Sequence, residues 1–265
     1  MRQEAGSGHA ATPVSEAAFQ ALRGYAEWED EPGFESLGRK SDRKLPRQCG
    51  DFIASFEVSS PAHYKAKLQA PCWPGGESGL TIGVGYDLRH ASAAEFREHW
   101  SALLPAVVID RLLPYCEKVE PDLAKRKLAA AALKDIAISF EAATTVFTDV
   151  MLPMHTLKTE KCFPNTGDLH DISMGALVSL VFNRGPSLGS DDSRKEMRNI
   201  AAHMQAKAFD KVAGEIRDMK RIWQDKAGVG GLLDRRDNEA AAFEEGLRLQ
   251  LVAAKPGGLV TPAIA

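Results

Sequence analysis

Three residues in the first third of the chain are of the types that cleave a glycosidic bond. Glu57 lies between two apolar residues, and Thr81 and Asp87 belong to the glycine-rich segment 75–87. Glycoside hydrolysis uses two carboxyl groups, one protonated to assist the leaving oxygen and one ionised to activate water or attack. Apolar neighbours would desolvate Glu57 and favour the protonated form that a general acid needs. We therefore predict Glu57 as the acid and Asp87 as its ionised partner, with the Thr81 hydroxyl positioning the water.

The segment between Thr81 and Asp87 alternates apolar residues with glycines. Period two predicts a strand or small hairpin whose apolar face, including Tyr86, packs on a core. The other face carries Gly83 and Gly85, and glycine within a strand often marks the close approach of a ligand. A straight strand would separate the two end residues by roughly 20 Å. They can serve one bond only if the chain bends sharply at its glycines.

The composition excludes several function classes. The chain has 265 residues, of which 44% are hydrophobic and 26% charged, as in ordinary globular proteins. Lysine and arginine total 33 against 36 acidic residues, and the net charge of -3 gives no basic field for nucleic acid. No apolar run reaches the roughly 18 residues of a membrane span. Phosphate-loop, dinucleotide, nucleophile-elbow and zinc-protease motifs are missing, so we expect no cofactor and no metal.

The four cysteines lie far apart and form no C-x-x-C pair, which excludes zinc-ribbon and thioredoxin-type sites. Two disulfides and four free thiols both fit this spacing. The cysteines are Cys49, Cys72, Cys116 and Cys162.

The chain divides into three parts by composition. Residues 1–45 form a polar, loosely ordered N-terminal segment with a short helix-like piece at 15–28, residues 46–252 form the folded domain, and residues 253–265 form a frayed tail. Apolar residues at three- and four-residue spacing predict a mainly helical α+β domain. The first helix is capped by Asp51. The other predicted helices cover 91–104, 106–117, 121–139, 141–157, 171–184, 193–205, 208–225 and 232–251.

Four segments, in order over roughly residues 50–248, resemble the phage-type lysozymes (glycoside hydrolase family 24-like), specifically their pesticin-like branch. They are 55–58 (SFEV), 76–88 (GESGLTIGVGYDL), 177–185 (LVSLVFNRG) and 233–239 (LDRRDNE). The resemblance implies a lysozyme-like fold in which a small β-hairpin edges the active-site cleft. It also implies cleavage of the β-1,4 bond between N-acetylmuramic acid and N-acetylglucosamine in peptidoglycan.

The resemblance also assigns the site residues. In the common phage enzymes a catalytic Asp lies between the Glu and the Thr, where this sequence offers only Glu77. The pesticin-like pattern places the Asp after the Thr, which fits Asp87 and leaves Glu77 as the reserve carboxylate. Structural ion pairing is the preferred interpretation of Arg235, Arg236 and Glu239. The candidate substrate contacts are Gly83, Gly85, Tyr86, Asn183 and Arg184, although Arg184 also suits the end of a helix.

The biological setting follows from this substrate. Peptidoglycan lies outside the bacterial inner membrane, yet the first residues carry no apolar signal-peptide core. We therefore expect synthesis in the cytoplasm and action in the periplasm of a target bacterium, as an antibacterial toxin or secreted effector. Expected partners are peptidoglycan, a periplasmic immunity protein and a secretion apparatus or carrier that binds the N-terminal segment. The alternatives are a phage endolysin, a lytic transglycosylase and a non-catalytic cell-wall binding module.

Overall fold

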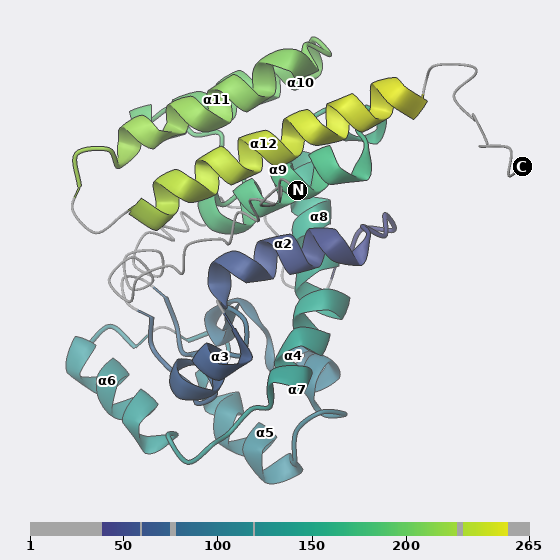
Figure 1. Ribbon diagram of the computed structural model, residues 1–265. Helices are drawn as coiled ribbons and strands as arrows, with labels where there is room; N and C mark the ends of the chain where they lie inside the picture. Colours follow the sequence, from purple (N-terminus) through teal and green to yellow (C-terminus); the bar gives the residue numbers. More distant parts are fainter. Residues whose placement is uncertain (1–38, 59, 75–77, 119, 227–229, 254–265) are drawn as a thin grey trace, which may run out of the picture.

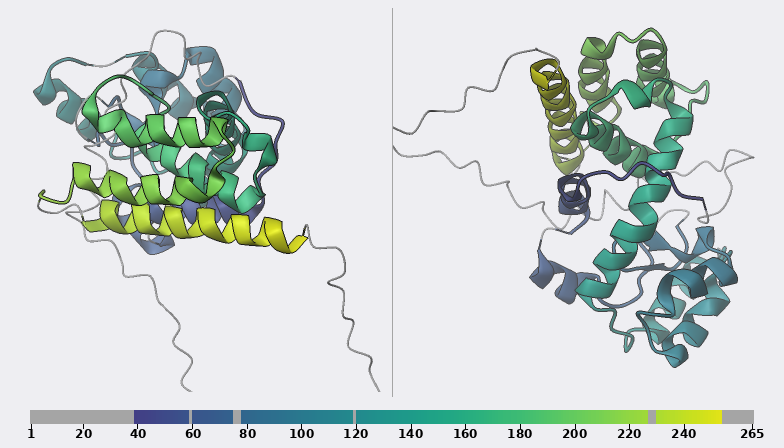
Figure 2. Two further views of the ribbon diagram at one scale, coloured as in Figure 1. Left: turned by 90° about the horizontal axis from the view of Figure 1, so that it is seen from above. Right: turned by 90° about the vertical axis from the view of Figure 1, so that its right-hand side faces the viewer.

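The computed structural model describes residues 39–58, 60–74, 78–118, 120–226 and 230–253. Two helical lobes lie at opposite ends of one long helix (Figures 1 and 2). The longer helices and the two strands are α2 (Arg47–Glu57), α3 (Pro61–Lys67), β1 (Thr81–Ile82), β2 (Tyr86–Asp87), α4 (Ala93–Trp100), α5 (Ala106–Leu112), α6 (Leu123–Ala132), α7 (Phe140–Val146), α8 (Leu152–Cys162), α9 (Asp171–Arg184), α10 (Lys195–Gln205), α11 (Val212–Asp218) and α12 (Gly230–Ala253). The predicted class, mainly helical with a small sheet, is confirmed.

The long helix between the lobes is continuous from α7 through a π-helical turn (Phe147–Met151) to the end of α8. The helix predicted over 141–157 therefore extends further, to Cys162. In the right-hand view of Figure 2 it runs from the small lobe, which holds α3 to α7 and the strands, to the large lobe, which holds α9 to α12.

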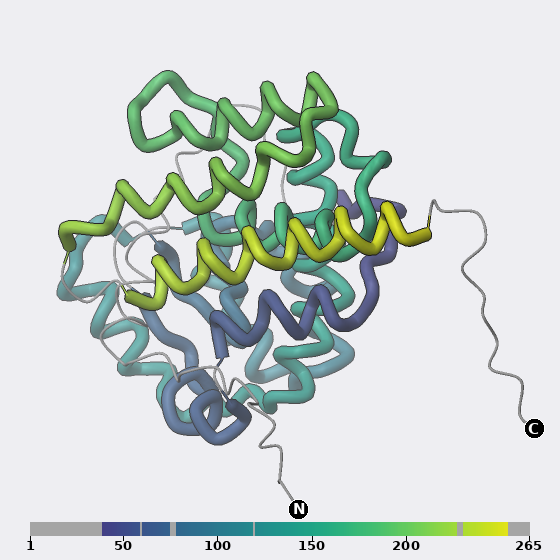
Figure 3. The backbone as a smooth tube through the Cα atoms, turned by 45° about the horizontal axis from the view of Figure 1, so that its top comes forward, coloured from purple at the N-terminus to yellow at the C-terminus, as the bar shows by residue number. Residues whose placement is uncertain are grey.

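Helix α9 belongs to both lobes. Its Met174 and Val178 side chains pack in the small-lobe core, whereas Leu177 and Leu180 pack in the large-lobe core. Helix α12 runs along α9, and α2 packs against α9 as well (Figures 1 and 3). Both neighbours approach closely at glycines: a Cβ on Gly246 would lie 2.4 Å from the Ser173 nitrogen, and one on Gly175 would lie 2.7 Å from Cys49 Sγ. This packing brings the end of α2 close to the start of α12.

Local sequence signals explain several helix starts, with one correction. Helix α2 begins four residues before the predicted cap, so Asp51 lies inside the helix and forms an exposed ion pair with Arg47. Helix α3 is not predicted by the spacing of apolar residues. It begins with Ser60, whose side chain accepts the His63 N–H, followed by Pro61 at the first helical position.

The described part of the predicted N-terminal segment is anchored to the large lobe. Arg43 forms an ion pair with Asp171 at 2.8 Å and donates to the carbonyls of Thr166 and Leu169. Residues 1–38, with the predicted helix-like piece at 15–28, lie outside the described residues, and so do residues 254–265 of the predicted tail. Within the described ranges, no helix combines the length and apolar character needed to cross a membrane.

Candidate active site

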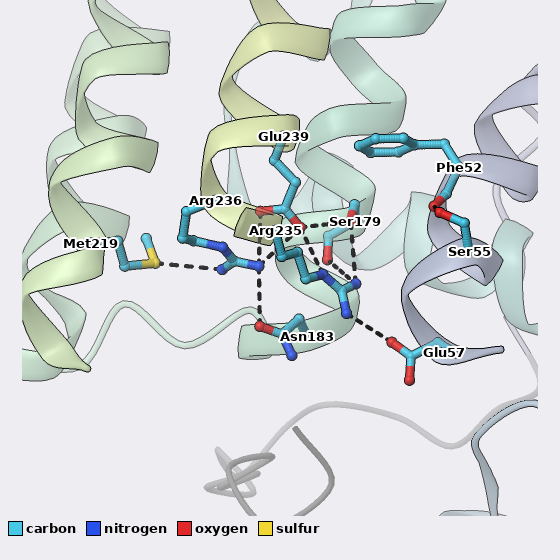
Figure 4. Close-up of polar contacts among 9 residues, drawn as sticks. All are labelled: Phe52, Ser55, Glu57, Ser179, Asn183, Met219, Arg235, Arg236 and Glu239. Carbon is cyan, nitrogen blue, oxygen red and sulfur yellow. Dashed lines mark hydrogen bonds and ion pairs between the residues drawn. The ribbon is translucent and has the colours of Figure 1, made fainter. Parts of the chain in front are cut away.

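Glu57 is the last residue of α2, and the side chain of Arg235 from α12 holds its carboxylate (Figure 4). Arg235 Nη1 donates to Glu57 Oε1 at 2.8 Å. The Arg235 side chain is 1% exposed, whereas that of Glu57 is 24% exposed. No described residue donates a hydrogen bond to Glu57 Oε2. One carboxylate oxygen is thus fixed from the protein interior while the other is open.

The predicted apolar setting of Glu57 is therefore wrong. Its neighbour Phe56 does not enclose the carboxyl, because the Phe56 ring packs against the Arg235 guanidinium at 4.8 Å. The polar partner of Glu57 is a charged group that is distant in sequence, which the flanking residues could not reveal.

Glu239 anchors the arginines behind Glu57. Its Oε1 accepts hydrogen bonds from Ser179 Oγ at 2.6 Å, Arg236 Nη2 at 2.9 Å and Arg235 Nε at 3.0 Å. Its Oε2 lies 2.8 Å from Arg236 Nη2. Glu57, Arg235, Arg236 and Glu239 form the charge cluster, in which two guanidinium groups balance two carboxylates. The ion pairs predicted on the last helix are confirmed, but they are buried instead of lying on its surface.

Burial dominates the electrostatics of this cluster. Removal from water lowers the pKa of the Arg236 guanidinium to about 10, against the opposing attraction of Glu239. Arg236 is also 3.7 Å from Met219 Sδ and 5.9 Å from the Trp223 ring centroid. Because buried charges are tolerated only when paired, Glu239 is needed to keep both arginines in place.

The end of α9 contributes one of the two predicted substrate contacts to this neighbourhood. Asn183 Oδ1 accepts a hydrogen bond from Arg236 Nη2 at 3.1 Å, so Asn183 borders the charge cluster. Arg184 instead donates to the Ser193 carbonyl at 2.7 Å and stacks 5.1 Å from the Trp223 ring centroid. Arg184 is in the last turn of α9, as its structural interpretation expects, and its guanidinium is engaged by contacts inside the large lobe that the sequence did not predict.

The strands fold back on each other as the site requires. They are antiparallel, and Thr81 is the direct partner of Asp87. The predicted bend is therefore confirmed. Asp87 Oδ2 accepts the Gly79 N–H at 3.0 Å and Oδ1 accepts the Arg89 N–H at 2.9 Å. The Thr81 hydroxyl donates to the Gly79 carbonyl at 3.3 Å. Asp87 and Thr81 thus lie side by side and both contact Gly79.

The glycines form the turn of this hairpin, which corrects the prediction of an exposed glycine face. Both have positive φ, 59° at Gly83 and 74° at Gly85, a conformation that glycine adopts at little cost. Gly83 is buried, and a Cβ there would lie 3.1 Å from Trp100 and 3.2 Å from Ala143. Only Gly85 is exposed. Gly83 is required by the turn and is not accessible to substrate.

Tyr86 does not face a substrate either. It is buried, and its hydroxyl is 2.8 Å from His99 Nδ1. Its ring packs edge-on against Trp100. Burial raises the pKa of the Tyr86 hydroxyl far above its usual range and lowers the pKa of His99. The predicted role of Tyr86 in substrate binding is wrong, whereas its predicted place on the core side of the hairpin is confirmed.

The hairpin turn reaches the end of α9. A Cβ on Gly85 would lie 3.6 Å from the Phe182 ring, and Phe182 directly precedes Asn183. The exposed turn and the charge cluster therefore lie on either side of the same helix end. The structure links Glu57 to Asn183 through the arginines of the charge cluster and places Gly85 against Phe182. It pairs Thr81 with Asp87 at the other end of the short strands. Glu77 lies outside the described residues.

Sequence reasoning missed Ser179 and treated Arg235 as a structural residue only. Ser179 lies in the middle of an apolar stripe, where a single polar residue is the signal for a buried hydrogen-bond partner. The spacing of Arg235 and Arg236 from Glu239 predicted their ion pairs. Nothing in that spacing indicates that Arg235 also contacts Glu57, which is 178 residues away in the sequence.

None of the four cysteines forms a disulfide in the structure, so of the two interpretations left open the one with four thiols holds. Burial raises the pKa of Cys49 and Cys116 to about 11 and that of Cys162 to about 12. These three thiols are therefore protonated at neutral pH. Among the described residues, no three His, Cys, Asp or Glu side chains converge as metal ligands would.

Comparison with known proteins adds one similarity. Residues 60–162 match a family described as a domain of unknown function (DUF8812). The match covers the small lobe and the connecting helix, with Thr81 and Asp87, but stops short of Glu57 and of α12. No curated protein matches the chain.

Proposed function

We propose that this protein is a peptidoglycan hydrolase of the lysozyme type, which cleaves the β-1,4 bond between N-acetylmuramic acid and N-acetylglucosamine. The observation that carries the proposal is the geometry of Glu57. A buried guanidinium fixes one carboxylate oxygen, and the other oxygen is open at a partly exposed helix end. Positioned carboxyl groups of this kind transfer protons to reacting oxygens.

In this proposal Glu57 is the general acid: it binds substrate in the protonated form, and its Oε2–H delivers the proton to the leaving glycosidic oxygen. The carboxylate that remains is the state paired with Arg235 in the structure. Arg235 keeps the carboxyl group in one orientation. Asp87 and Thr81, which are paired across the hairpin, activate and position the attacking water. Asn183 and the exposed turn at Gly85 contact the glycan on either side of Glu57.

One observation favours a second reaction on the same substrate. Both Asp87 oxygens already accept backbone N–H groups, so this carboxylate supports the hairpin. A lytic transglycosylase needs only Glu57 and releases anhydro-muropeptides. Mass spectrometry of the soluble products separates the two reactions, because hydrolysis adds one water and transglycosylation adds none.

The test is the clearing of isolated bacterial cell walls by Glu57→Gln. We expect a loss of at least about a hundredfold, the usual contribution of a general acid. Asp51→Asn is the matched control, because Asp51 is an exposed carboxylate on the same helix. Full activity of the Glu57 variant would exclude Glu57 as the acid. Sedimentation of the wild-type protein with cell walls, with no release of soluble products, would indicate a binding module.

The proposed setting is attack on a target bacterium by a toxin or secreted effector. The producing cell would then encode a periplasmic immunity protein that covers the open side of Glu57. Periplasm-directed expression with and without neighbouring genes tests this: protection supports the toxin, and lysis unaffected by any neighbour favours an endolysin.

A further inference from the structure

A pocket of about 410 Å³ lies on the small lobe, between α6 and the segment that leads into β1. This volume is in the range of small-ligand sites, about 300–1,000 Å³. The pocket wall includes the aromatic residues Trp73 and Tyr115 and the cationic residues Lys118, Lys125 and Arg126. None of these residues belongs to the charge cluster, so the pocket is a separate candidate site.

The aromatic wall is held in place from two sides. Trp73 Nε1 donates to the Ser78 carbonyl at 3.0 Å. The Arg126 guanidinium stacks 5.6 Å from the Trp73 ring centroid, and Arg126 Nε also donates to the Glu120 carbonyl. A fixed indole with a cation against it provides a flat apolar surface beside positive charge.

The charges of the pocket wall favour an anion. Three cations face two carboxylates, Glu117 and Glu120, so the wall carries a net positive charge in a chain whose net charge is -3. Glu120 is 3.9 Å from Lys125 Nζ, a distance that leaves the lysine only weakly engaged. Lys118 and Lys125 are both exposed and can reach a carboxylate that enters the pocket.

The pocket wall is hydrogen-bonded to the candidate catalytic hairpin. Gly79 lines the pocket and donates its N–H to Asp87. A Cβ on Gly79 would lie 2.5 Å from Asp87 Oδ1, so the wall and the carboxylate are in direct contact. On the other side of the pocket, the Glu117 N–H donates to the Leu88 carbonyl at 3.1 Å. One lining residue of the pocket, Gly79, is therefore in direct contact with the Asp87 carboxylate.

We propose that this pocket binds the peptide stem of peptidoglycan through its carboxylates and small apolar side chains. The inference rests on the proposed function, because it assigns a second part of the same substrate to a second site. The glycan would lie at the hairpin and Glu57, and a stem that branches from it would reach Lys118, Lys125 and Trp73. The protein would then prefer peptidoglycan with intact stems over bare glycan strands.

The first measurement is the binding of a free stem tetrapeptide, followed by NMR or calorimetry. Lys125→Glu places a carboxylate at the pocket and should weaken binding about five- to tenfold, because it replaces an attraction with a repulsion. Lys127→Glu is the matched control: it is on the same helix, is exposed and does not line the pocket. Both glutamates lie in the first turns of α6, where acidic residues are favourable, so both variants should fold.

The second measurement compares the release of small products, counted by mass spectrometry, from intact cell walls and from glycan strands whose stems have been removed by an amidase. Wild type and Lys127→Glu should prefer the intact substrate, and Lys125→Glu should lose this preference while it still cleaves the bare strands. No binding of the tetrapeptide, or equal effects of the two substitutions, would overturn the inference. Binding that Lys125→Glu weakens, in a protein that cleaves neither substrate, would support the stem site and exclude the proposed hydrolase.

Discussion

The two acidic side chains of the candidate site are held in opposite ways. Both Asp87 oxygens accept backbone N–H groups of residues that flank its own hairpin. Its side chain is 14% exposed and also forms a longer ion pair, 3.8 Å, with the adjacent Arg89 Nε. Glu57 gives one oxygen to a buried guanidinium from the far end of the chain and keeps the other open. The first arrangement defines the path of a loop, whereas the second positions a carboxyl group at the end of a helix.

The two carboxylates also differ in which residues fix their orientation. Asp87 depends on neighbours within eight residues, so its geometry follows from the local turn. Glu57 depends on Arg235, which in turn depends on Ser179 and Glu239. A buried charge cluster of this kind is weak evidence for stability, but removal of one member leaves an unpaired charge in the interior. The orientation of Glu57 is therefore more vulnerable to a distant substitution than that of Asp87.

Glu239→Gln is the substitution that most directly breaks the charge cluster. It leaves two buried guanidinium groups with one carboxylate, and we expect a loss of about 3–5 kcal/mol in the free energy of unfolding. Urea denaturation followed by circular dichroism measures this loss.

Glu244→Gln provides the matched control on the same helix. Glu244 forms a two-bond pair with Arg217, but its side chain is 51% exposed, so the expected loss is below about 1 kcal/mol. Equal losses in the two variants would show that burial does not distinguish the cluster from a surface pair.

In the hairpin, Gly83→Ala is the substitution that we expect to destabilise the protein most. Alanine at positive φ costs about 1–2 kcal/mol, and the contacts with Trp100 and Ala143 add overpacking, for a total of about 2–4 kcal/mol. Gly85→Ala shares the positive φ but has room for the methyl group, so only the backbone cost applies. Thermal unfolding of both variants checks the order, and a larger loss at Gly85 would contradict it.

The same contrast explains how much the sequence could predict. A strand or small hairpin was predictable because its signals are local: alternation and glycines that allow a bend. The register that pairs Thr81 with Asp87 was not predicted. The role of both glycines in the bend was predicted, but the ligand-facing role was wrong for the buried Gly83. A strand pattern does not distinguish a ligand-facing glycine from one required by positive φ. Most helices were also predictable, whereas the start of α2 was not. This helix begins after Pro46 without a side-chain cap, so the preference of Asp for cap positions pointed to the wrong residue.

The charge cluster was predictable only in part, for a physical reason. Ion pairs at three- and four-residue spacing follow from helix geometry, so the pairing of Glu239 with Arg235 and Arg236 could be foreseen. Their burial depends on the packing of α2 and α12 against α9. The setting of Glu57 depends on that packing, and no local pattern near Glu57 contains it.

His155 packs against Phe182, next to the hairpin turn, and makes the stability of the fold depend on pH. Its ring is buried 4.6 Å from that of Phe182, which also contacts Gly85. Burial, with smaller contributions from Lys158 and His90, holds the pKa of His155 well below its usual range. Below pH about 6.5 the unfolded chain therefore binds a proton that the folded protein does not, and stability falls as the pH falls.

For this one histidine we expect a loss of about 2 kcal/mol between pH 6.5 and 5, at about 1.4 kcal/mol per pH unit. Urea denaturation of the wild type and of His155→Leu across this range measures the effect. The variant should show a flatter pH dependence, and parallel curves would exclude His155 as the source.

Apart from the control Glu244→Gln, the smallest expected change in stability comes from Asp87→Asn, which is also the sharpest test of the contrast between Asp87 and Glu57. The amide keeps one acceptor oxygen and replaces the other with a donor, so one of the N–H groups of Gly79 and Arg89 loses its partner. This costs about 1 kcal/mol in the free energy of unfolding. If Asp87 activates water, cell-wall clearing should fall about a hundredfold or more despite so small a loss. If activity only follows stability, the Asp87 carboxylate supports the hairpin alone. Loss of activity in Glu77→Gln would then move the second role to Glu77. Full activity in that variant as well would leave Glu57 as the acid–base group, and the products should be anhydro-muropeptides.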